Sequence, residues 1–374
     1  MDHSIIDYFI SLVKIDSESK SELAVATKIM TDLKQLGAEV IFDSANKQTG
    51  GDCGNLIAYF KGTADVEPVL LCAHLDTVVP GNGIKPIIKD GVIRSDGTTI
   101  LGADDKSGIA EILYGIKGAM DSGKPYPPIE ILFTISEEIG LCGSRFCDYS
   151  LLKAKRCFTF DTSKVGSIMN GSPSQNSLYF HFKGKKAHAG VEPEKGINAI
   201  RMASEAIANM PLGRIDEETT CNIGIINGGE ATNIVPDSVL VEGEVRSHSM
   251  QKLEKLTEEM CSVVRGVKEK YNAIDPVATV EIKAENSYPS FYIEESDELV
   301  QIAVATTKKV GLPVDIYRGG GGSDANILIQ NGIKSLVIGT GMANVHTVDE
   351  YIKVADLEVG AEWVKELLIA LGEK

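Results

Sequence analysis

Acidic residues and histidines follow several short apolar runs of this sequence, at the points where predicted strands end. Carboxylates crowded together repel one another unless a cation neutralises them. Carboxylate oxygens and imidazole nitrogens together suit zinc, with cobalt or manganese as alternatives. The pattern therefore predicts a metal site wherever these strand ends meet. The residues concerned are His74, Asp76, Asp104, Asp105, Glu137, Glu138, Asp161 and His346.

Taken one at a time, these residues have ordinary structural explanations. A histidine after a strand is more often structural than a ligand, and Asp104-Asp105 at a helix start suits a cap and the helix dipole. Paired glutamates such as Glu137-Glu138 usually lie in a solvated turn. The joint pattern favours metal, because functional groups gather at the carboxyl ends of parallel strands. Three carboxylates and two neutral imidazoles around two divalent ions leave one positive charge, which a bridging hydroxide balances.

The order of predicted elements indicates an α/β fold with a mixed, mostly parallel sheet and helices on both faces. Apolar runs at 69–73 and 129–135 are typical of strands buried on both faces. A helical pattern of apolar residues separates them and begins near Asp104-Asp105. The alternation of helices and strands returns after residue 288, with helices predicted at 297–310, 325–330 and 355–371 and strands at 314–317 and 335–338.

Between residues 173 and 285 the order of predicted strands and helices no longer alternates as in a parallel α/β fold, which predicts an inserted α+β domain. We therefore divide the chain into a discontinuous metal-binding domain, 1–172 and 286–374, and a second domain, 173–285. The second domain is expected to hold a four-stranded antiparallel sheet and two helices. The strands are predicted at 177–183, 219–226, 239–246 and 277–283, and the helices at 193–210 and 250–271.

Composition excludes several classes of function. Asp and Glu total 53 against 37 Lys and Arg, and this net charge of −16 argues against nucleic acid or anionic lipid as a main partner. No apolar run approaches the ~20 residues of a membrane span. Met1-Asp2-His3 lacks the start of a signal peptide, and the seven scattered cysteines are typical of reduced thiols. We expect a cytoplasmic protein.

Five motifs in order carry a resemblance to a known family. The chain resembles the dinuclear zinc metallopeptidases that include peptidase T, the aminoacylases and carboxypeptidase G. The likeness covers nearly the whole chain, and peptidase T-like members are the most similar in the length of the inserted domain. The motifs are His74-Leu75-Asp76, Leu101-Gly102-Ala103-Asp104-Asp105-Lys106, Ser136-Glu137-Glu138-Ile139-Gly140, Asp161 and His346-Thr347.

The resemblance implies two zinc ions per subunit, with cobalt or manganese as substitutes. Asp104 would bridge them, His74 and Asp161 would complete one site, and Glu138 and His346 the other. It also implies a cis peptide bond between Asp104 and the residue that follows it.

Two further carboxylates have implied roles in the reaction. Asp76 would orient the imidazole of His74. Glu137 would be the general base, activating a water that bridges the zinc ions and passing its proton to the leaving amine.

The resemblance places substrate contacts in the inserted domain, which would act as a lid. His188 would stabilise the oxyanion, often across a dimer interface, and Arg246 would hold the terminal carboxylate of the substrate. Asn233 would lie near the substrate backbone, and Gly322 and Ser323 at the mouth of the site. Three of these residues have structural explanations as well: His188 as a surface histidine, Arg246 in a salt bridge and Asn233 in a turn.

In the family, an aspartate such as Asp161 as the third acidic ligand is typical of aminopeptidases. We therefore expect metal-dependent hydrolysis of short peptides with a free amino terminus, by a tripeptidase or aminopeptidase that forms a homodimer through its lid. The alternative on the same metal site is an N-acyl-amino-acid amidohydrolase or carboxypeptidase. A non-catalytic peptide-binding protein would lack a ligand or the base, whereas the five ligand positions, the base and Asp76 are all present.

Overall fold

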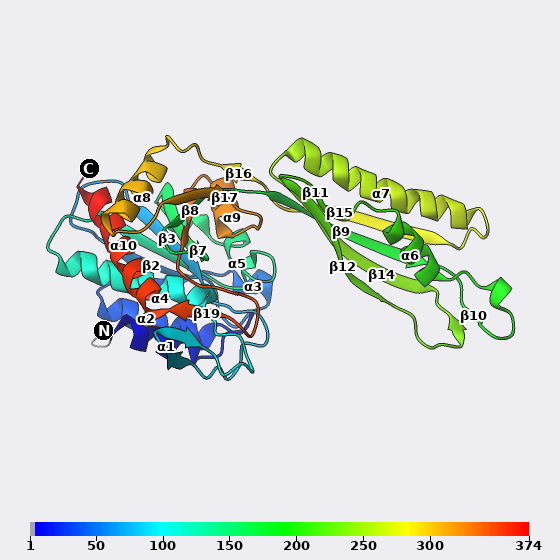
Figure 1. The fold of residues 1–374 in the computed structure, drawn as a ribbon, viewed down its shortest axis with the longest axis horizontal. Coiled ribbons are helices and arrows are strands. Elements are labelled where there is room, and N and C mark those ends of the chain that lie inside the picture. The colour runs from blue at the N-terminus through cyan, green and yellow to red at the C-terminus, as the bar shows by residue number, and fades with distance from the viewer. Residues whose placement is uncertain (1–3, 374) are drawn as a thin grey trace. The chain divides into compact units, whose positions relative to one another are not determined.

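The computed structural model describes residues 4–373, so the start of the chain, on which the expected absence of a signal peptide rests, lies outside them. The chain divides into two compact units (Figure 1). The first comprises the described residues up to Gly171, then Tyr292–Gly319, and the chain from Ser323 onward. The second comprises Ser172–Phe291 and Gly320–Gly322. Within residues 4–373, no helix has the length and apolar character that crossing a membrane requires.

A mixed sheet forms the centre of the first unit. Among the described residues it has nine strands in the order β1-β2-β6-β3-β7-β18-β8-β16, with β17 beside β8. Its middle strands, β6, β3, β7 and β18, are parallel, whereas β1, β2 and the β18–β8 pair are antiparallel. The strands are β1 (Glu39–Phe42), β2 (Leu56–Phe60), β3 (Val69–His74), β6 (Ile129–Thr134), β7 (Arg156–Thr162), β8 (Ser167–Ser172), β16 (Phe291–Tyr292), β17 (Asp315–Arg318) and β18 (Lys334–Gly339).

Helices cover both faces of this sheet, as the sequence predicts. α4 lies over β3 and β7, with α1 and α10 packed against it. Gly108 of α4 contacts Phe160, whereas Cys157 points to the other face and packs with Leu328 of α9. The helices are α1 (Ile5–Val13), α2 (Leu23–Gln35), α3 (Asn46–Thr49), α4 (Ala103–Asp121), α5 (Cys142–Arg145), α8 (Glu298–Lys309), α9 (Asp324–Gln330) and α10 (Val354–Gly372).

The register of the parallel strands brings their carboxyl ends to one edge. β3 and β6 are buried along their whole length, as their apolar runs predict. His74 pairs with Thr134, and Cys72 pairs with Thr159. The residues that follow β6 and the end of β7 therefore lie beside His74.

The second unit holds an antiparallel sheet covered by two helices (Figure 1). Within residues 172–291 this sheet has five strands in the order β11-β12-β14-β9-β15, one more than we predicted. The extra strand, β11, is a short edge strand paired only with β12, and its sequence Gly-Arg-Ile-Asp lacks a clear apolar alternation. The elements are β9 (Ser174–Lys183), α6 (Ala199–Ala208), β11 (Gly213–Asp216), β12 (Thr219–Gly228), β14 (Ser238–Ser247), α7 (Met250–Asn272) and β15 (Thr279–Tyr288).

The helix predicted at 193–210 is shorter in the structure. Pro193–Lys195 forms a separate 3-10 turn, and α6 begins only after Asn198, whose side chain accepts a hydrogen bond from Arg201 N. The helix therefore begins after the N-cap Asn198 and not at Pro193, where we predicted its start. Apolar side chains of α6 and α7 then pack on the sheet to form the core of this unit.

Candidate metal centre

Five polar segments meet at the carboxyl edge of the parallel strands. His74 ends β3, Asp161 lies near the end of β7, and Glu138 follows β6. Asp104 stands in the first turn of α4, and His346 lies in the loop between β18 and β19 (Tyr351–Lys353). The structure thus brings together all five residues that the resemblance implies as metal ligands.

The carboxylate of Asp104 faces two imidazoles at once. Its Oδ1 is 2.9 Å from His74 Nε2, and its Oδ2 is 3.2 Å from His346 Nε2. Asp161 Oδ1 lies 4.0 Å from His74 Nε2, and Glu138 Oε1 lies 3.1 Å from His346 Nε2. Two ligand groups result, each with its ligand atoms within 4.8 Å of one another: His74, Asp104 and Asp161, and then Asp104, Glu138 and His346. Asp104 belongs to both, as a bridging carboxylate must.

The electrostatics of the cluster fit divalent cations. Burial raises the pKa of Asp161, and the nearby charge of Asp104 raises it further. Hydrogen bonds to Asp104 and Glu138 raise the pKa of His346 to about 10. Burial alone would lower the pKa of His74, but its bonds to Asp104 and Asp76 raise it well above its usual value. Both histidine shifts reflect the negative charge of the surrounding carboxylates, which a bound cation would neutralise as well.

The backbone around Asp104 is irregular. The Asp104–Asp105 peptide bond is cis, as the resemblance implies. Both residues depart from helical φ and ψ, and Gly102 before them has a left-handed φ of 74°. Asp105 Oδ2 accepts a hydrogen bond from the main-chain N–H of His74 at 3.1 Å, so the start of α4 is tied directly to the end of β3.

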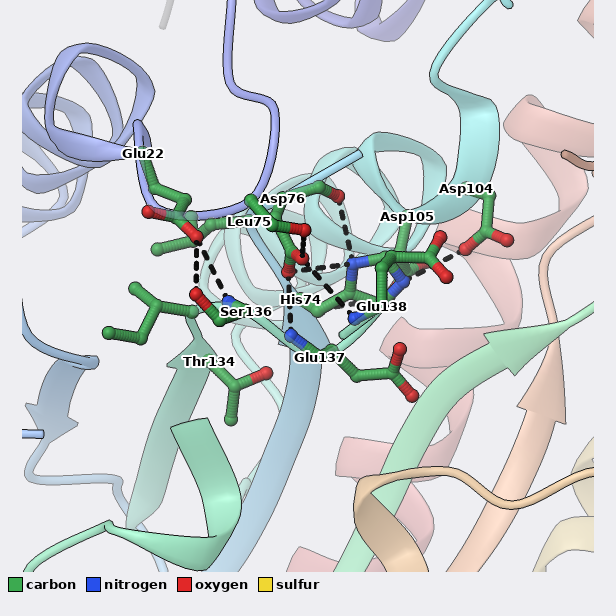
Figure 2. A network of polar contacts seen from close by, with 12 residues as sticks. Glu22, His74, Leu75, Asp76, Asp104, Asp105, Thr134, Ser136, Glu137 and Glu138 are labelled. Atoms are coloured by element: carbon green, nitrogen blue, oxygen red, sulfur yellow. Dashed lines mark hydrogen bonds and ion pairs between the residues drawn. The ribbon is translucent and has the colours of Figure 1, made fainter. Parts of the chain in front are cut away.

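Asp76 contacts more than the imidazole of His74. His74 Nδ1 lies 2.9 Å from the main-chain oxygen of Asp76 and 3.5 Å from its Oδ1. The same carboxylate accepts hydrogen bonds from the main-chain N–H groups of Glu137 and Glu138, at 2.9 and 3.2 Å, and from Ser19 Oγ at 2.6 Å. Asp76 therefore links the ligand on β3 to the turn that carries both glutamates (Figure 2).

The two adjacent glutamates differ in direction. Figure 2 shows the Glu138 carboxylate beside Asp104, whereas the Glu137 carboxylate points elsewhere. Glu137 is 8% exposed, and burial raises the pKa of its carboxyl, with a further rise from the charge of Asp161. Ligand atoms of Glu137, Glu138 and His74 also lie within 4.8 Å of one another, so Glu137 borders the cluster.

Glu22 is a site residue that sequence reasoning missed. Its side chain is fully buried, and its Oε1 accepts hydrogen bonds from Ser136 N at 2.9 Å and Ser136 Oγ at 3.1 Å (Figure 2). Ser136 precedes the two glutamates and has a left-handed φ of 51°. In the sequence, Glu22 resembles any acid before a helix, and nothing there indicates its contact with Ser136.

Glu22 also belongs to another group of ligand atoms within 4.8 Å of one another, with Asp52 and Cys53. Its Oε1 accepts hydrogen bonds from Ser136 and Lys20 N, and its buried Oε2 has no hydrogen-bond partner among the described residues. Burial raises the pKa of the Cys53 thiol far above its usual value, and the nearby carboxylates raise it further. Because metals bind the thiolate, this group is a poor metal site.

The predicted substrate contacts lie mostly in the second unit. His188 is exposed and pairs with Ile234 through the short strands β10 (Ala187–His188) and β13 (Ile234–Val235). Asn233 is exposed next to β13, and its main-chain oxygen accepts a hydrogen bond from Ala189 N at 2.9 Å. His188 and Asn233 are therefore neighbours on one surface of this unit.

Arg246 on β14 is held by a carboxylate of its own strand. Its Nε and Nη2 donate to the two carboxylate oxygens of Glu244 at 2.9 and 3.0 Å, and its Nη1 lies 3.4 Å from Gly320 O. Gly322 lies so close to the ring of Tyr288 that a Cβ would come within 2.3 Å of it. Ser323 is buried in the first unit, and its hydroxyl caps α9 by accepting a bond from Ala325 N.

Comparison with known proteins identifies the family of the chain. The family model of Peptidase family M20/M25/M40 matches residues 70–370. The YqjE protein of Bacillus subtilis strain 168 is 40% identical over 365 residues, which is 97% of each chain. The crystal structure of aminopeptidase PepT from Bacillus cereus is similar at 39% identity and a TM-score of 0.87, with 98% of each chain covered. A tripeptidase structure from Staphylococcus aureus is similar at 36% identity and a TM-score of 0.91, over 99% of this chain and 98% of that one.

The fold and the site thus define a metal-binding peptidase. The chain belongs to Peptidase family M20/M25/M40.

Proposed function

We propose that the protein is a dinuclear zinc aminopeptidase that hydrolyses short peptides, tripeptides above all, with a free amino terminus. The observation that carries the proposal is the carboxylate of Asp104, whose two oxygens each face a different imidazole. Asp161 as the third acidic ligand and the similarity to an aminopeptidase and a tripeptidase support action at the amino terminus.

Five side chains would hold the metal. Asp104 would lie between the two zinc ions, with His74 and Asp161 on one side and Glu138 and His346 on the other. Zinc ions bound in this way polarise the scissile carbonyl and lower the pKa of water at the site.

Glu137 would move the proton. Its carboxylate borders the ligand cluster without facing Asp104 (Figure 2). It would accept a proton from the attacking water and donate it to the nitrogen of the leaving amine. Burial raises the pKa of Glu137, which makes its carboxylate a stronger base than an exposed one.

The second unit would bind the rest of the peptide. His188 would stabilise the oxyanion, Asn233 would contact the peptide backbone, and Arg246 would hold the terminal carboxylate. Gly322 and Ser323 would border the entrance, where the Ser323 hydroxyl, as the cap of α9, supports the loop. We further propose that this unit closes as a lid and forms a homodimer.

A cytoplasmic location completes the proposal. All seven cysteines are free thiols in residues 4–373, which is typical of a reducing compartment.

Three matched peptides test this function. The zinc-loaded protein is incubated with a tripeptide, its N-acetylated form and its carboxy-terminal amide, each with and without chelator, and products are identified by mass spectrometry. We expect cleavage of the free tripeptide at its first bond, loss of cleavage with chelator, and no cleavage of the acetylated form. Cleavage of the acetylated peptide would instead make the enzyme an amidohydrolase or carboxypeptidase on the same metal site. Absence of any cleavage with two zinc ions bound would contradict the proposed substrate.

A further inference from the structure

The carboxylate of Glu350 is buried against the backbone that leads into α4. Glu350 is 1% exposed. Its Oε2 accepts hydrogen bonds from the main-chain N–H groups of Leu101 at 2.7 Å and Gly102 at 2.8 Å, and its Oε1 accepts one from Asp104 N at 3.0 Å. One side chain thus holds three N–H groups of the segment that carries the bridging aspartate. Hydrogen bonds to a carboxylate are shorter and stronger than those between neutral groups.

Glu350 belongs to the same loop as another proposed ligand, His346. Glu350 N donates to Thr347 O at 3.1 Å, within the turn that follows His346. The loop is closed at its base, because Ala343 N donates to Tyr351 O at 2.9 Å and Tyr351 N donates to Ala343 O at 3.0 Å.

The far side of Glu350 is anchored as well. β19, which begins at Tyr351, pairs with β5 (Val92–Arg94), and β5 pairs with β4 (Ile87–Lys89). The His346 loop therefore ends in a small sheet, and Glu350 stands where this sheet meets the Asp104 segment.

We propose that Glu350 is a positioning residue that couples the two ligand-bearing loops, fixing the backbone of Asp104 relative to the loop of His346. The inference rests on the proposed metal site. Because Asp104 faces both imidazoles, a shift of its backbone disturbs both ligand groups at once. Partners behind metal ligands typically change metal affinity or activity by about 10–100-fold when substituted.

Glu350→Gln tests this coupling with little change in volume. The NH2 group that replaces one carboxylate oxygen cannot accept a hydrogen bond, so at least one of the three N–H groups loses its acceptor. The matched control is Asp349→Asn, which removes the same charge from the neighbouring, exposed residue of the loop. Zinc affinity is measured by competition with a chromophoric chelator. We expect both zinc ions of Glu350→Gln to bind about 10–100-fold more weakly, with Asp349→Asn close to the wild type.

A second variant separates geometry from charge. Glu350→Asp keeps the negative charge near Asp104 but shortens the side chain by one methylene, so its carboxylate no longer reaches all three N–H groups. We expect it to weaken zinc binding as Glu350→Gln does. Wild-type affinity in Glu350→Asp would mean that Glu350 acts through its charge alone and would overturn the inference. If Glu350→Gln does not fold, Glu350→Asp carries the same comparison.

Hydrogen exchange of the metal-free protein provides a readout independent of activity. We expect faster exchange in a peptide that spans residues 99–106 of Glu350→Gln, with unchanged exchange in peptides from β6. If the wild type binds two zinc ions and Glu350→Gln matches it in both exchange and zinc affinity, the positioning role alone is overturned. A wild type that binds fewer than two zinc ions would overturn the proposed function, and this inference with it.

Discussion

The ligand cluster of the first unit and the predicted peptide contacts of the second differ in how the fold holds them. His74 and Asp104 are 2% and 8% exposed, and the register of buried parallel strands sets the positions of His74, Glu138 and Asp161, whereas His346 is exposed in its loop. His188 and Asn233 are exposed, and they lie in or next to a pair of two-residue strands, β10 and β13.

This difference suits the two tasks. Groups that make and break bonds need fixed positions to a fraction of an ångström, whereas groups that receive a substrate must first be open to it. Buried carboxylates behind the cluster, such as Asp76 and Glu22, provide that fixation by accepting main-chain N–H bonds from the glutamate turn. We therefore expect substitutions in the cluster to change metal content or kcat. Substitutions of the proposed peptide-binding residues Asn233 and Arg246 should change KM, whereas His188, proposed at the oxyanion, should affect kcat.

The largest effect is expected for Asp104→Ala. Because both ligand groups share Asp104, its removal should cost both zinc ions and reduce activity to that of the chelator-treated protein. Zinc per subunit is measured after dialysis, together with turnover of a tripeptide. Asp121→Ala, at the exposed far end of the same helix, is the control and should retain both. Two zinc ions retained by Asp104→Ala would contradict a bridging role.

Glu137→Ala separates proton transfer from metal binding. Removing a general base typically costs about 10²–10⁴-fold in turnover, and zinc content should stay at two per subunit. Glu138→Ala, one residue along the chain, should instead lose zinc from one site, because Glu138 contacts His346. Metal analysis and kcat of both variants decide the assignment. Loss of zinc in both variants, or near-normal turnover in Glu137→Ala, would refute it.

The ends of strands could be predicted because they follow from local patterns. The apolar run at β3, and the one at β6 that only Glu130 interrupts, indicate buried parallel strands, and parallel strands must end at a common edge. The motifs on those ends then meet without any further information, and the resemblance adds the irregular backbone at Asp104.

The supporting carboxylates could not be predicted in the same way. Glu22 and Glu350 accept hydrogen bonds from main-chain N–H groups. Every residue except proline has such a group, so residue types in the sequence do not indicate the partner. The partners are also remote: Glu22 lies 114 residues from Ser136 and Glu350 lies 249 residues from Leu101. The only signal for Glu350 is its nearness to His346 in the chain. The sequence also left two roles open for Arg246, because an arginine suits both a substrate carboxylate and a salt bridge. The structure shows a bond to Glu244.

Arg246→Gln tests the second unit. If Arg246 holds the terminal carboxylate, KM for a free tripeptide should rise by about 10–100-fold, the loss of a charged hydrogen bond, with kcat and zinc content little changed. KM for the corresponding carboxy-terminal amide should not change. Lys186→Gln is the control, since it removes an exposed cation of the same unit that pairs with Glu230. An equal rise in KM for both peptides would mean that the bond to Glu244 is structural.

The smallest effect concerns an exposed ion pair of the second unit, Asp216 with Lys252. Hydrogen bonds from Lys252 Nζ and from Glu218 N lower the pKa of Asp216 to about 2. Since the pKa is lower in the folded chain than the usual 3.8, the Asp216 carboxylate favours folding above about pH 4 and loses this contribution as pH falls through 2. Asp216→Asn should therefore lower the Tm by about 1 °C at pH 7, an amount typical of exposed pairs, and by progressively less in acid. Calorimetry of the zinc-free wild type and variant between pH 7 and 2.5 measures the difference, and a difference that grows in acid would contradict the lowered pKa. Because the pair touches neither the cluster nor the peptide contacts, zinc content and KM should not move at all, which makes this variant the baseline against which the larger effects are judged.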